Sequence, residues 1–224
     1  MRLLFLSNTR GNQNQAIYSL IRLWLPGNAR IGYIPSTPDP GRGHFQEVEA
    51  FFNGIMPSYR MDYIDIHNKT EEPERLERQL KECDAIYLSG GNTFRFLKAI
   101  SDSGLDLLLK RLAYGKVFIG TSAGGLIMTP GIEIASAEND IRLENTKGLA
   151  LVEFGFYPHF IPENRGQLRE INACLDVFPE IYALPEFSGL AVTETEITPL
   201  GPVYRFGKGM SQGEILSNPV KNPT

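Results

Sequence analysis

The stretch Lys116-Val-Phe-Ile-Gly120-Thr-Ser-Ala-Gly-Gly-Leu-Ile-Met128 joins a short apolar run to a G-x-S-x-G motif. The apolar run predicts a buried strand, and the small residues around Ser122 allow a sharp turn into a helix. A serine at such a turn has its hydroxyl raised above the sheet, with the main-chain N–H of the next residue facing the same side. The same pattern also occurs in turns that only pack tightly. Other parts of the sequence are therefore needed to distinguish a catalytic serine from a structural turn.

Strand and helix patterns alternate along the chain before this motif. Apolar runs predict strands over Leu3–Leu6, Ile31–Ile34 and Ala85–Leu88, and alternating apolar residues predict a strand over Met61–Ile66. Apolar residues at helical spacing predict helices over Ala16–Leu25, His44–Ile55, Glu72–Glu82 and Phe94–Ile100. This alternation predicts an α/β fold, a single-domain and mostly parallel sheet with helices on both faces.

The C-terminal third has a different pattern. Ala191–Thr195 and Val203–Phe206, separated by a turn with two prolines, predict an antiparallel hairpin at an edge of the sheet. Residues 1–216 are expected to form the domain, and residues 217–224, with two further prolines, a loose tail.

The composition of the chain favours a soluble globular protein over a nucleic-acid-binding or membrane protein. The chain has 224 residues, 42% of them hydrophobic and 21% charged, with a net charge of −4; these values are typical of a soluble globular domain. Lysine and arginine are scattered, which argues against a nucleic-acid partner. The N-terminal apolar run is too short for a signal peptide or a membrane span. We therefore expect a cytoplasmic protein with no membrane partner.

Metal and cofactor chemistry has little support. Three histidines without paired spacing, and the isolated Cys83 and Cys174, do not form a metal-ligand pattern. We expect no metal and no cofactor, and reduced, structural thiols.

An activated serine needs a base, and the base needs an orienting acid. Among the histidines, only His159 follows an apolar, strand-like run that would bring it to a strand end, although a buried core histidine is the alternative. Glu186 closes a second apolar run, Ile181–Leu184, and is the favoured acid. Asp140 and Asp176 compete for that role, but Asp176 is expected to face solvent.

Ser89-Gly-Gly-Asn-Thr93 is a glycine-rich turn at a predicted strand end. It lacks the G-K-[ST] of a phosphate-binding P-loop. Two uses remain open and are compatible: a glycine N–H that completes an oxyanion hole, and a turn before a helix capped by Thr93.

Four ordered segments resemble the peptidase E family. They are Leu88-Ser-Gly-Gly-Asn-Thr-Phe94, Gly120-Thr-Ser-Ala-Gly124, Tyr157-Pro-His-Phe160 and Ala183-Leu-Pro-Glu186. Family members are serine dipeptidases that cleave an N-terminal aspartate from dipeptides, within a wider group that includes cyanophycinases. The resemblance implies a fold similar to class I glutamine amidotransferase domains, with serine in place of the nucleophilic cysteine.

Carried over by position, the resemblance implies Ser122 as nucleophile, His159 as base and Glu186 as its orienting acid. The N–H groups of Gly91 and Ala123 would form the oxyanion hole.

The resemblance also implies substrate-binding residues. Arg165 would bind the β-carboxylate of the substrate aspartate, with Arg169 as the fallback; exposed, solvated arginines are the alternative. Asn92 is a further candidate. Asp140 would hold the substrate's ammonium group or only stabilise the site.

Three functions follow. The first is a dipeptidase for Asp-Xaa peptides, acting through an aspartyl-enzyme ester, with a small peptide as its partner and a monomeric or homodimeric state. The second is a hydrolase of β-aspartyl or cyanophycin-like peptides. The third is a non-catalytic domain that binds a small metabolite.

Overall fold

The computed structural model of the protein describes residues 1–68, 70, 72–210, 213–217 and 220–221. The strands are β1 (Arg2–Leu6), β2 (Arg30–Ile34), β3 (Arg60–Tyr63), β4 (Ala85–Leu88), β5 (Val117–Thr121), β6 (Gly155–Tyr157), β7 (Glu180–Ala183), β8 (Gly189–Thr193), β9 (Glu196–Leu200), β10 (Val203–Gly207), β11 (Glu214–Leu216) and β12 (Val220–Lys221). The helices are α1 (Gln15–Trp24), α2 (Gly43–Asn53), α3 (Pro73–Glu82), α4 (Thr93–Asp102), α5 (Asp106–Leu112), α6 (Ala123–Met128), the 3-10 helix η1 (Glu133–Glu138) and α7 (Arg165–Cys174).

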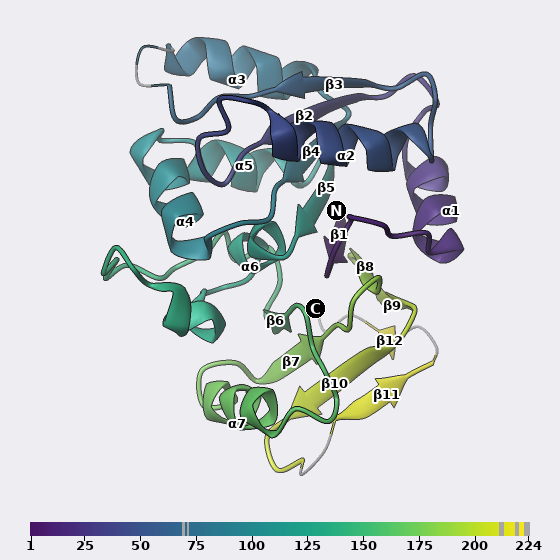
Figure 1. The fold of residues 1–224 in the computed structure, drawn as a ribbon, viewed down its shortest axis with the longest axis vertical. Helices are drawn as coiled ribbons and strands as arrows, with labels where there is room; N and C mark the ends of the chain where they lie inside the picture. Colours follow the sequence, from purple (N-terminus) through teal and green to yellow (C-terminus); the bar gives the residue numbers. More distant parts are fainter. Residues whose placement is uncertain (69, 71, 211–212, 218–219, 222–224) are drawn as a thin grey trace.

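A large sheet forms the centre of the molecule (Figure 1). Its strand order is β12-β9-β8-β1-β5-β4-β2-β3. The five strands from β1 to β3 in this order run parallel, whereas β8, β9 and β12 are each antiparallel to their neighbours. The prediction of an α/β fold with a mostly parallel sheet is confirmed.

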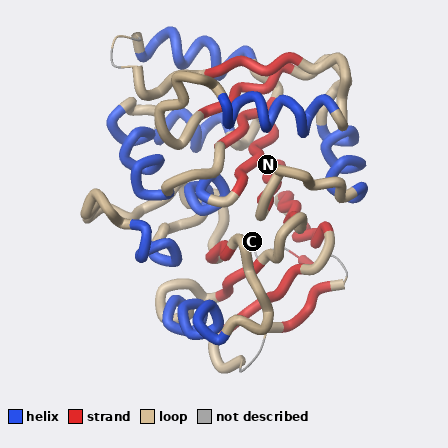
Figure 2. The backbone as a smooth tube through the Cα atoms, viewed as in Figure 1, coloured by secondary structure: helices blue, strands red, loops and turns tan. Residues whose placement is uncertain are grey.

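Alternate residues of the central strands fill two separate cores, because successive side chains of a strand point to opposite faces. In β1, Leu3 and Phe5 belong to a core that includes residues of α3, α4, α5 and α6. Leu4 and Leu6 belong to a second core, which α1 and α2 cover. Helices therefore cover both faces of the sheet, as Figure 2 also shows.

A second, smaller sheet lies at the lower end of the view in Figure 1, beside α7. Its strand order is β11-β10-β7-β6, with β6 and β7 parallel. This sheet was not predicted, and it corrects the predicted hairpin. The hairpin is formed by β8 and β9, whereas the segment Val203–Phe206 lies in β10 and pairs with β7 and β11. The strand pattern was visible in the sequence, but a strand's partner is set by long-range packing.

The two sheets share one core. The ring of Phe5 in β1 lies 5.6 Å from that of Phe154 and 5.3 Å from that of Phe156 in β6, measured between centroids. Phe156 is fully buried. These contacts fix the carboxyl ends of β6 and β7 close to those of the large sheet.

The C-terminal prediction is tested only in part. Val220–Lys221 form β12 and pair with Ile197 and Glu196 of β9, while residues 218–219 and 222–224 of the expected tail lie outside the described residues. The single domain over residues 1–216 stays a prediction.

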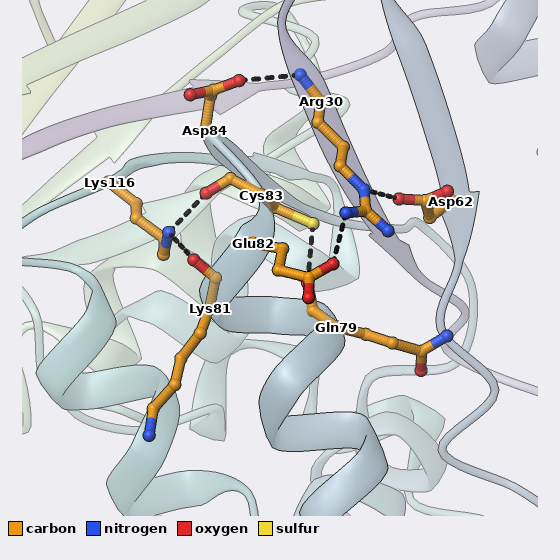
Figure 3. Close-up of polar contacts among 8 residues, drawn as sticks. All are labelled: Arg30, Asp62, Gln79, Lys81, Glu82, Cys83, Asp84 and Lys116. Atoms are coloured by element: carbon orange, nitrogen blue, oxygen red, sulfur yellow. Dashed lines mark hydrogen bonds and ion pairs between the residues drawn. The ribbon is translucent and has the colours of Figure 1, made fainter.

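At the amino ends of the parallel strands, charged side chains bond to one another and to the main chain (Figure 3). The guanidinium of Arg30, at the start of β2, pairs with the carboxylates of Asp62 and Glu82. Asp84 accepts a hydrogen bond from the main-chain N–H of Arg30 at 2.8 Å, and Lys116 donates to the carbonyls of residues 81 and 83. Arg30 and Lys116 thus each have two partners at this edge.

No helix within the described ranges is suited to crossing a bilayer. The longest, α2, has 11 residues, whereas a transmembrane helix needs about 20 apolar residues.

Candidate active site

The turn between β5 and α6 holds Ser122 in a strained conformation. Its backbone angles are φ 49° and ψ −112°, outside the regions that L-residues ordinarily occupy. The Ser122 N–H donates to the carbonyl of Leu6 at 2.9 Å, which ties the turn to the neighbouring strand β1. The predicted strand, turn and helix are all present at this motif.

Ser122, His159 and Glu186 form a hydrogen-bonded chain. The Oγ of Ser122 lies 2.9 Å from Nε2 of His159, and Nδ1 of His159 lies 2.5 Å from Oε1 of Glu186. The side chains of His159 and Glu186 are 47% and 44% exposed, so a substrate can reach them from solvent. The structure thus brings the three predicted residues together, and their catalytic roles stay predictions.

His159 is held by its main chain as well as by its side chain. Its φ is +56°, which is uncommon for a residue other than glycine. Its N–H donates to Oγ of Ser7 at 2.9 Å, and its carbonyl accepts from Nε2 of Gln167 at 3.0 Å. The Oε1 of Gln167 in turn accepts from the N–H of Ile161 at 2.7 Å. Sequence reasoning missed both supporting residues, because neither lies in a recognisable motif.

The three residues come from both sheets. Ser122 follows β5 of the large sheet, whereas His159 and Glu186 follow β6 and β7 of the small sheet. All three lie at carboxyl ends of strands, where ligands of parallel sheets usually bind. The site therefore exists only where the two sheets meet.

The glycine-rich turn after β4 lies against Ser122. A Cβ added to Gly90 would be 3.7 Å from Cβ of Ser122. Gly91 has φ +134°, and a Cβ there would be 2.2 Å from Oγ of Ser36, so only glycine fits. Within the described part of the chain, neither Gly91 nor Ala123 donates its main-chain N–H to another protein group. Both donors are thus available to a ligand.

A cavity of about 270 Å³ opens beside the serine. Ser122, His159 and Gly91 line it, together with Arg10, His44 and Glu47, whose place beside the serine the sequence did not predict. Arg10 and Glu47 form an exposed ion pair at 3.6 Å. They lie in a loop and in the first turns of α2, where charged residues are ordinary, so the sequence carried no signal for them.

Asn92 and Asp140, two of the predicted substrate-binding residues, already have protein partners. Asn92 caps α4 by accepting from the N–H of Arg95 at 2.9 Å, and its amide nitrogen donates to the carbonyl of Glu138 at 3.0 Å. The predicted Thr93 cap is therefore wrong by one residue, since Asn92 has the extended backbone of a cap. Asp140 pairs with the Arg95 guanidinium at 2.6 Å, which lowers the pKa of the Asp140 carboxyl.

Arg165, the third predicted substrate-binding residue, is the exposed first residue of α7. Like Asn92 and Asp140, it does not line the cavity at Ser122. The binding roles of all three stay predictions. A larger cavity, of about 660 Å³, adjoins the first at Thr37 and contains Arg95, but it lacks Ser122 and His159. We assign the chemistry to the smaller cavity because Ser122 and His159 both line it.

The remaining ionisable candidates have other roles. Asp176 is 83% exposed and pairs with Lys208 at 3.4 Å, as expected for a surface residue. Among the described residues, no group of three histidine, cysteine or acidic side chains is arranged to hold a metal ion. Cys83 and Cys174 are free thiols, and burial raises the pKa of Cys83 to about 11.

This arrangement is suited to nucleophilic acyl transfer. A histidine within hydrogen-bond reach of a serine can accept its proton, and a carboxylate on the other ring nitrogen fixes the tautomer that does so. Two unpaired N–H groups beside the serine can stabilise the oxyanion of a tetrahedral intermediate.

Comparison with known proteins agrees with this class. Residues 3–200 match the model of peptidase family S51. The chain is 27% identical over 230 residues to the peptidase E of a Nostoc species, covering 95% of this chain and 92% of the relative. It is 38% identical over 108 residues to the uncharacterized peptidase Lmo0363 of Listeria monocytogenes; that match spans about half of each chain, 46% of this one and 51% of the relative.

A solved structure of a peptidase from an acI-B1 actinobacterium has the same fold. The TM-score is 0.65 at 18% sequence identity, and the match covers 98% of this chain and 96% of the other. The chain belongs to peptidase family S51. The resemblance to peptidase E is thereby confirmed, and a peptidase is the class of protein that the family defines.

Proposed function

We propose that the chain is a serine dipeptidase that hydrolyses dipeptides with N-terminal aspartate. The observation that carries the proposal is the hydrogen-bonded chain from Ser122 through His159 to Glu186, with distances of 2.9 and 2.5 Å. The peptidase E names of relatives such as those from Nostoc and Streptomyces coelicolor support the same activity.

In the proposed reaction, Ser122 attacks the peptide carbonyl while His159 takes the hydroxyl proton at Nε2. The N–H groups of Gly91 and Ala123 stabilise the oxyanion. His159 then donates its proton to the leaving amine, which leaves an aspartyl ester on Ser122. Water attacks this ester with His159 as base, and the released acid and the free serine complete the cycle. Glu186 keeps the proton of His159 on Nδ1 throughout.

The test is hydrolysis of Asp-Leu, Asn-Leu, Glu-Leu and β-Asp-Leu by the wild type and by Ser122→Ala. We expect Asp-Leu to be cleaved fastest, and the variant to lose activity by about 10³-fold or more. Fastest cleavage of β-Asp-Leu would instead favour the β-aspartyl class of substrates. A wild type inactive on all four peptides would refute the proposed specificity.

Recognition of the β-carboxylate is assigned to Arg165 on its position relative to the family motifs. A guanidinium binds a carboxylate through two parallel hydrogen bonds, which favours Asp over Asn. Arg165→Ala is expected to lower the Asp-Leu to Asn-Leu ratio of kcat/KM by about tenfold or more. Arg10→Ala is the matched comparison, because Arg10 lines the cavity at Ser122. If only Arg10→Ala changes the ratio, the assignment to Arg165 is wrong.

A further inference from the structure

Two buried serines lie behind the glycine-rich turn. Ser36, just after β2, and Ser89, just after β4, are 3% and 4% exposed. The Oγ–H of Ser36 donates to the carbonyl of Gly90 at 2.6 Å, and the Oγ of Ser89 lies 3.2 Å from the same carbonyl. The main-chain N–H of Ser36 donates to Oγ of Ser89 at 2.7 Å. The two side chains therefore form one small network that ends on a single peptide group.

That peptide group joins Gly90 to Gly91. A trans peptide is planar, so its C=O and N–H point in opposite directions. When Ser36 holds the carbonyl of Gly90 on one side, the N–H of Gly91 is turned to the other side. Gly90 lies against Ser122, with its missing Cβ position 3.7 Å from Cβ of Ser122. All of these residues line the same cavity.

The peptide needs such a restraint. Glycine has the widest conformational freedom of any residue, so two adjacent glycines could turn this peptide over at little cost. A donor contributes to catalysis only if its orientation is fixed before the charge develops. The hydroxyl of Ser36 fixes it by bonding the carbonyl and by filling the space beside Gly91, where a Cβ would lie 2.2 Å from Oγ of Ser36.

Another buried serine, Ser188, which directly precedes β8, gives a comparison. Ser188 is fully buried, yet its Oγ has no hydrogen-bond partner within the described residues. Its side chain does not line the cavity. Burial at the carboxyl edge therefore does not by itself create a network of this kind.

We propose that Ser36 is a positioning residue of the oxyanion hole, which holds the Gly91 N–H toward the substrate's developing oxyanion. The inference rests on the proposed serine nucleophile but not on the proposed aspartyl specificity. Ser89 supports Ser36 by accepting its N–H and by bonding the same carbonyl.

The experiment measures how fast a fluorophosphonate probe labels Ser122. The phosphoryl oxygen of the probe occupies an oxyanion hole during attack, so the rate reports on the hole without any assumption about the peptide substrate. Ser36→Ala is expected to label roughly tenfold to a hundredfold more slowly than the wild type, less than the loss of a whole donor. Ser89→Ala, which keeps the Ser36 hydroxyl, is expected to show a smaller decrease.

Ser188→Ala is the matched control and should label at the wild-type rate. Hydrolysis of Asp-Leu gives a second readout, in which kcat falls in Ser36→Ala while KM stays within about twofold, because the oxyanion forms only in the transition state. Circular dichroism establishes that each variant is folded.

The outcomes are distinct. Slow labelling of folded Ser36→Ala with normal labelling of Ser188→Ala supports the inference, even if no aspartyl dipeptide is cleaved. Equal labelling of Ser36→Ala and wild type overturns it while leaving the proposed function intact. A wild type that does not label at all overturns both this inference and the serine nucleophile.

Discussion

The two edges of the large sheet differ in how their residues are held. At the carboxyl edge, Ser122 has positive φ, and so has His159, which follows β6 of the small sheet and lies beside Ser122 with its side chain nearly half exposed. At the amino edge, none of the described residues that begin β2 to β5 has positive φ, and Arg30 is neutralised by two carboxylates (Figure 3). The large sheet thus has an amino edge where Arg30 is paired and unstrained, and a carboxyl edge where Ser122 is strained and the N–H groups of Gly91 and Ala123 are unpaired.

We therefore expect residues at the carboxyl edge to matter mainly for activity, and residues at the amino edge to matter mainly for stability. Strained backbone costs on the order of 1–3 kcal/mol for each residue and persists only when its surroundings over-determine it. Here the restraints are the packing of Phe5 against Phe154, which joins the two sheets, and the hydrogen bonds of Ser7 and Gln167 to the main chain of His159. Changes at the carboxyl edge should alter activity, and some should raise stability, whereas changes at the amino edge should alter stability alone.

The largest expected effect comes from Ser122→Gly. Activity should fall by about 10³-fold or more because the proposed nucleophile is lost. The free energy of unfolding should rise by about 1 kcal/mol, because glycine accepts the φ of +49° without strain. Chemical denaturation measures the change. Ser122→Ala removes the hydroxyl but keeps the strain, and an equal gain in that variant would contradict the explanation.

Alanine substitutions of the two glycines that flank β5 test whether the two edges tolerate added side chains differently. A Cβ at Gly124 would lie 2.0 Å from the carbonyl oxygen of Leu88, which is rigid backbone. Gly124→Ala should therefore lower the free energy of unfolding by about 3 kcal/mol or prevent folding. Gly115, at the amino end, has nothing within 4 Å of its Cβ position, and Gly115→Ala should be neutral or stabilising by up to about 1 kcal/mol. Similar losses in both variants would refute this contrast.

The charged network at the amino edge gives a smaller effect. Arg30→Ala should lower the free energy of unfolding by about 1 kcal/mol, because two partly exposed carboxylates lose their partner. The kcat/KM of the folded variant should stay within about twofold of wild type. Arg60→Ala, which alters an exposed arginine at the start of β3, is the control. A large loss of turnover in folded Arg30→Ala would show that the two edges are not independent.

The smallest effect concerns the thiols. Burial, followed by the nearby Asp62, raises the pKa of Cys83 to about 11, above the ordinary value of about 8.5. Its contribution to stability is therefore complete below about pH 8.5 and is lost as the pH rises through 11. At pH 8, iodoacetamide should alkylate the half-buried Cys174 before Cys83, as mass spectrometry of the two peptides would reveal. Alkylation of Cys83 first in the native protein would be inconsistent with this assignment.

Much of the fold could be predicted because its signals are local. The strand Ala85–Leu88 has the predicted bounds, and α1 and α4 differ from prediction by one or two residues. The pairing of β10 with β7 could not be predicted, since its pattern is that of any half-buried strand. The second sheet depends on contacts between segments far apart in the chain.

The candidate site likewise contains residues that the sequence could predict and residues that it could not. Ser122, His159 and Glu186 lie in short motifs at strand ends, which made them visible in the sequence. Arg10, Glu47 and Ser36 are ordinary loop or helix residues by composition, and only the folded chain brings them beside Ser122. Positioning residues such as Gln167 act through main-chain atoms, which no side-chain pattern reveals.

The division of the triad between two sheets has a consequence for biosynthesis. Ser122 precedes His159 and Glu186 in the chain and belongs to the other sheet, so it is translated before both of them. A growing polypeptide on the ribosome therefore contains the proposed nucleophile before its proposed base and orienting acid have been made.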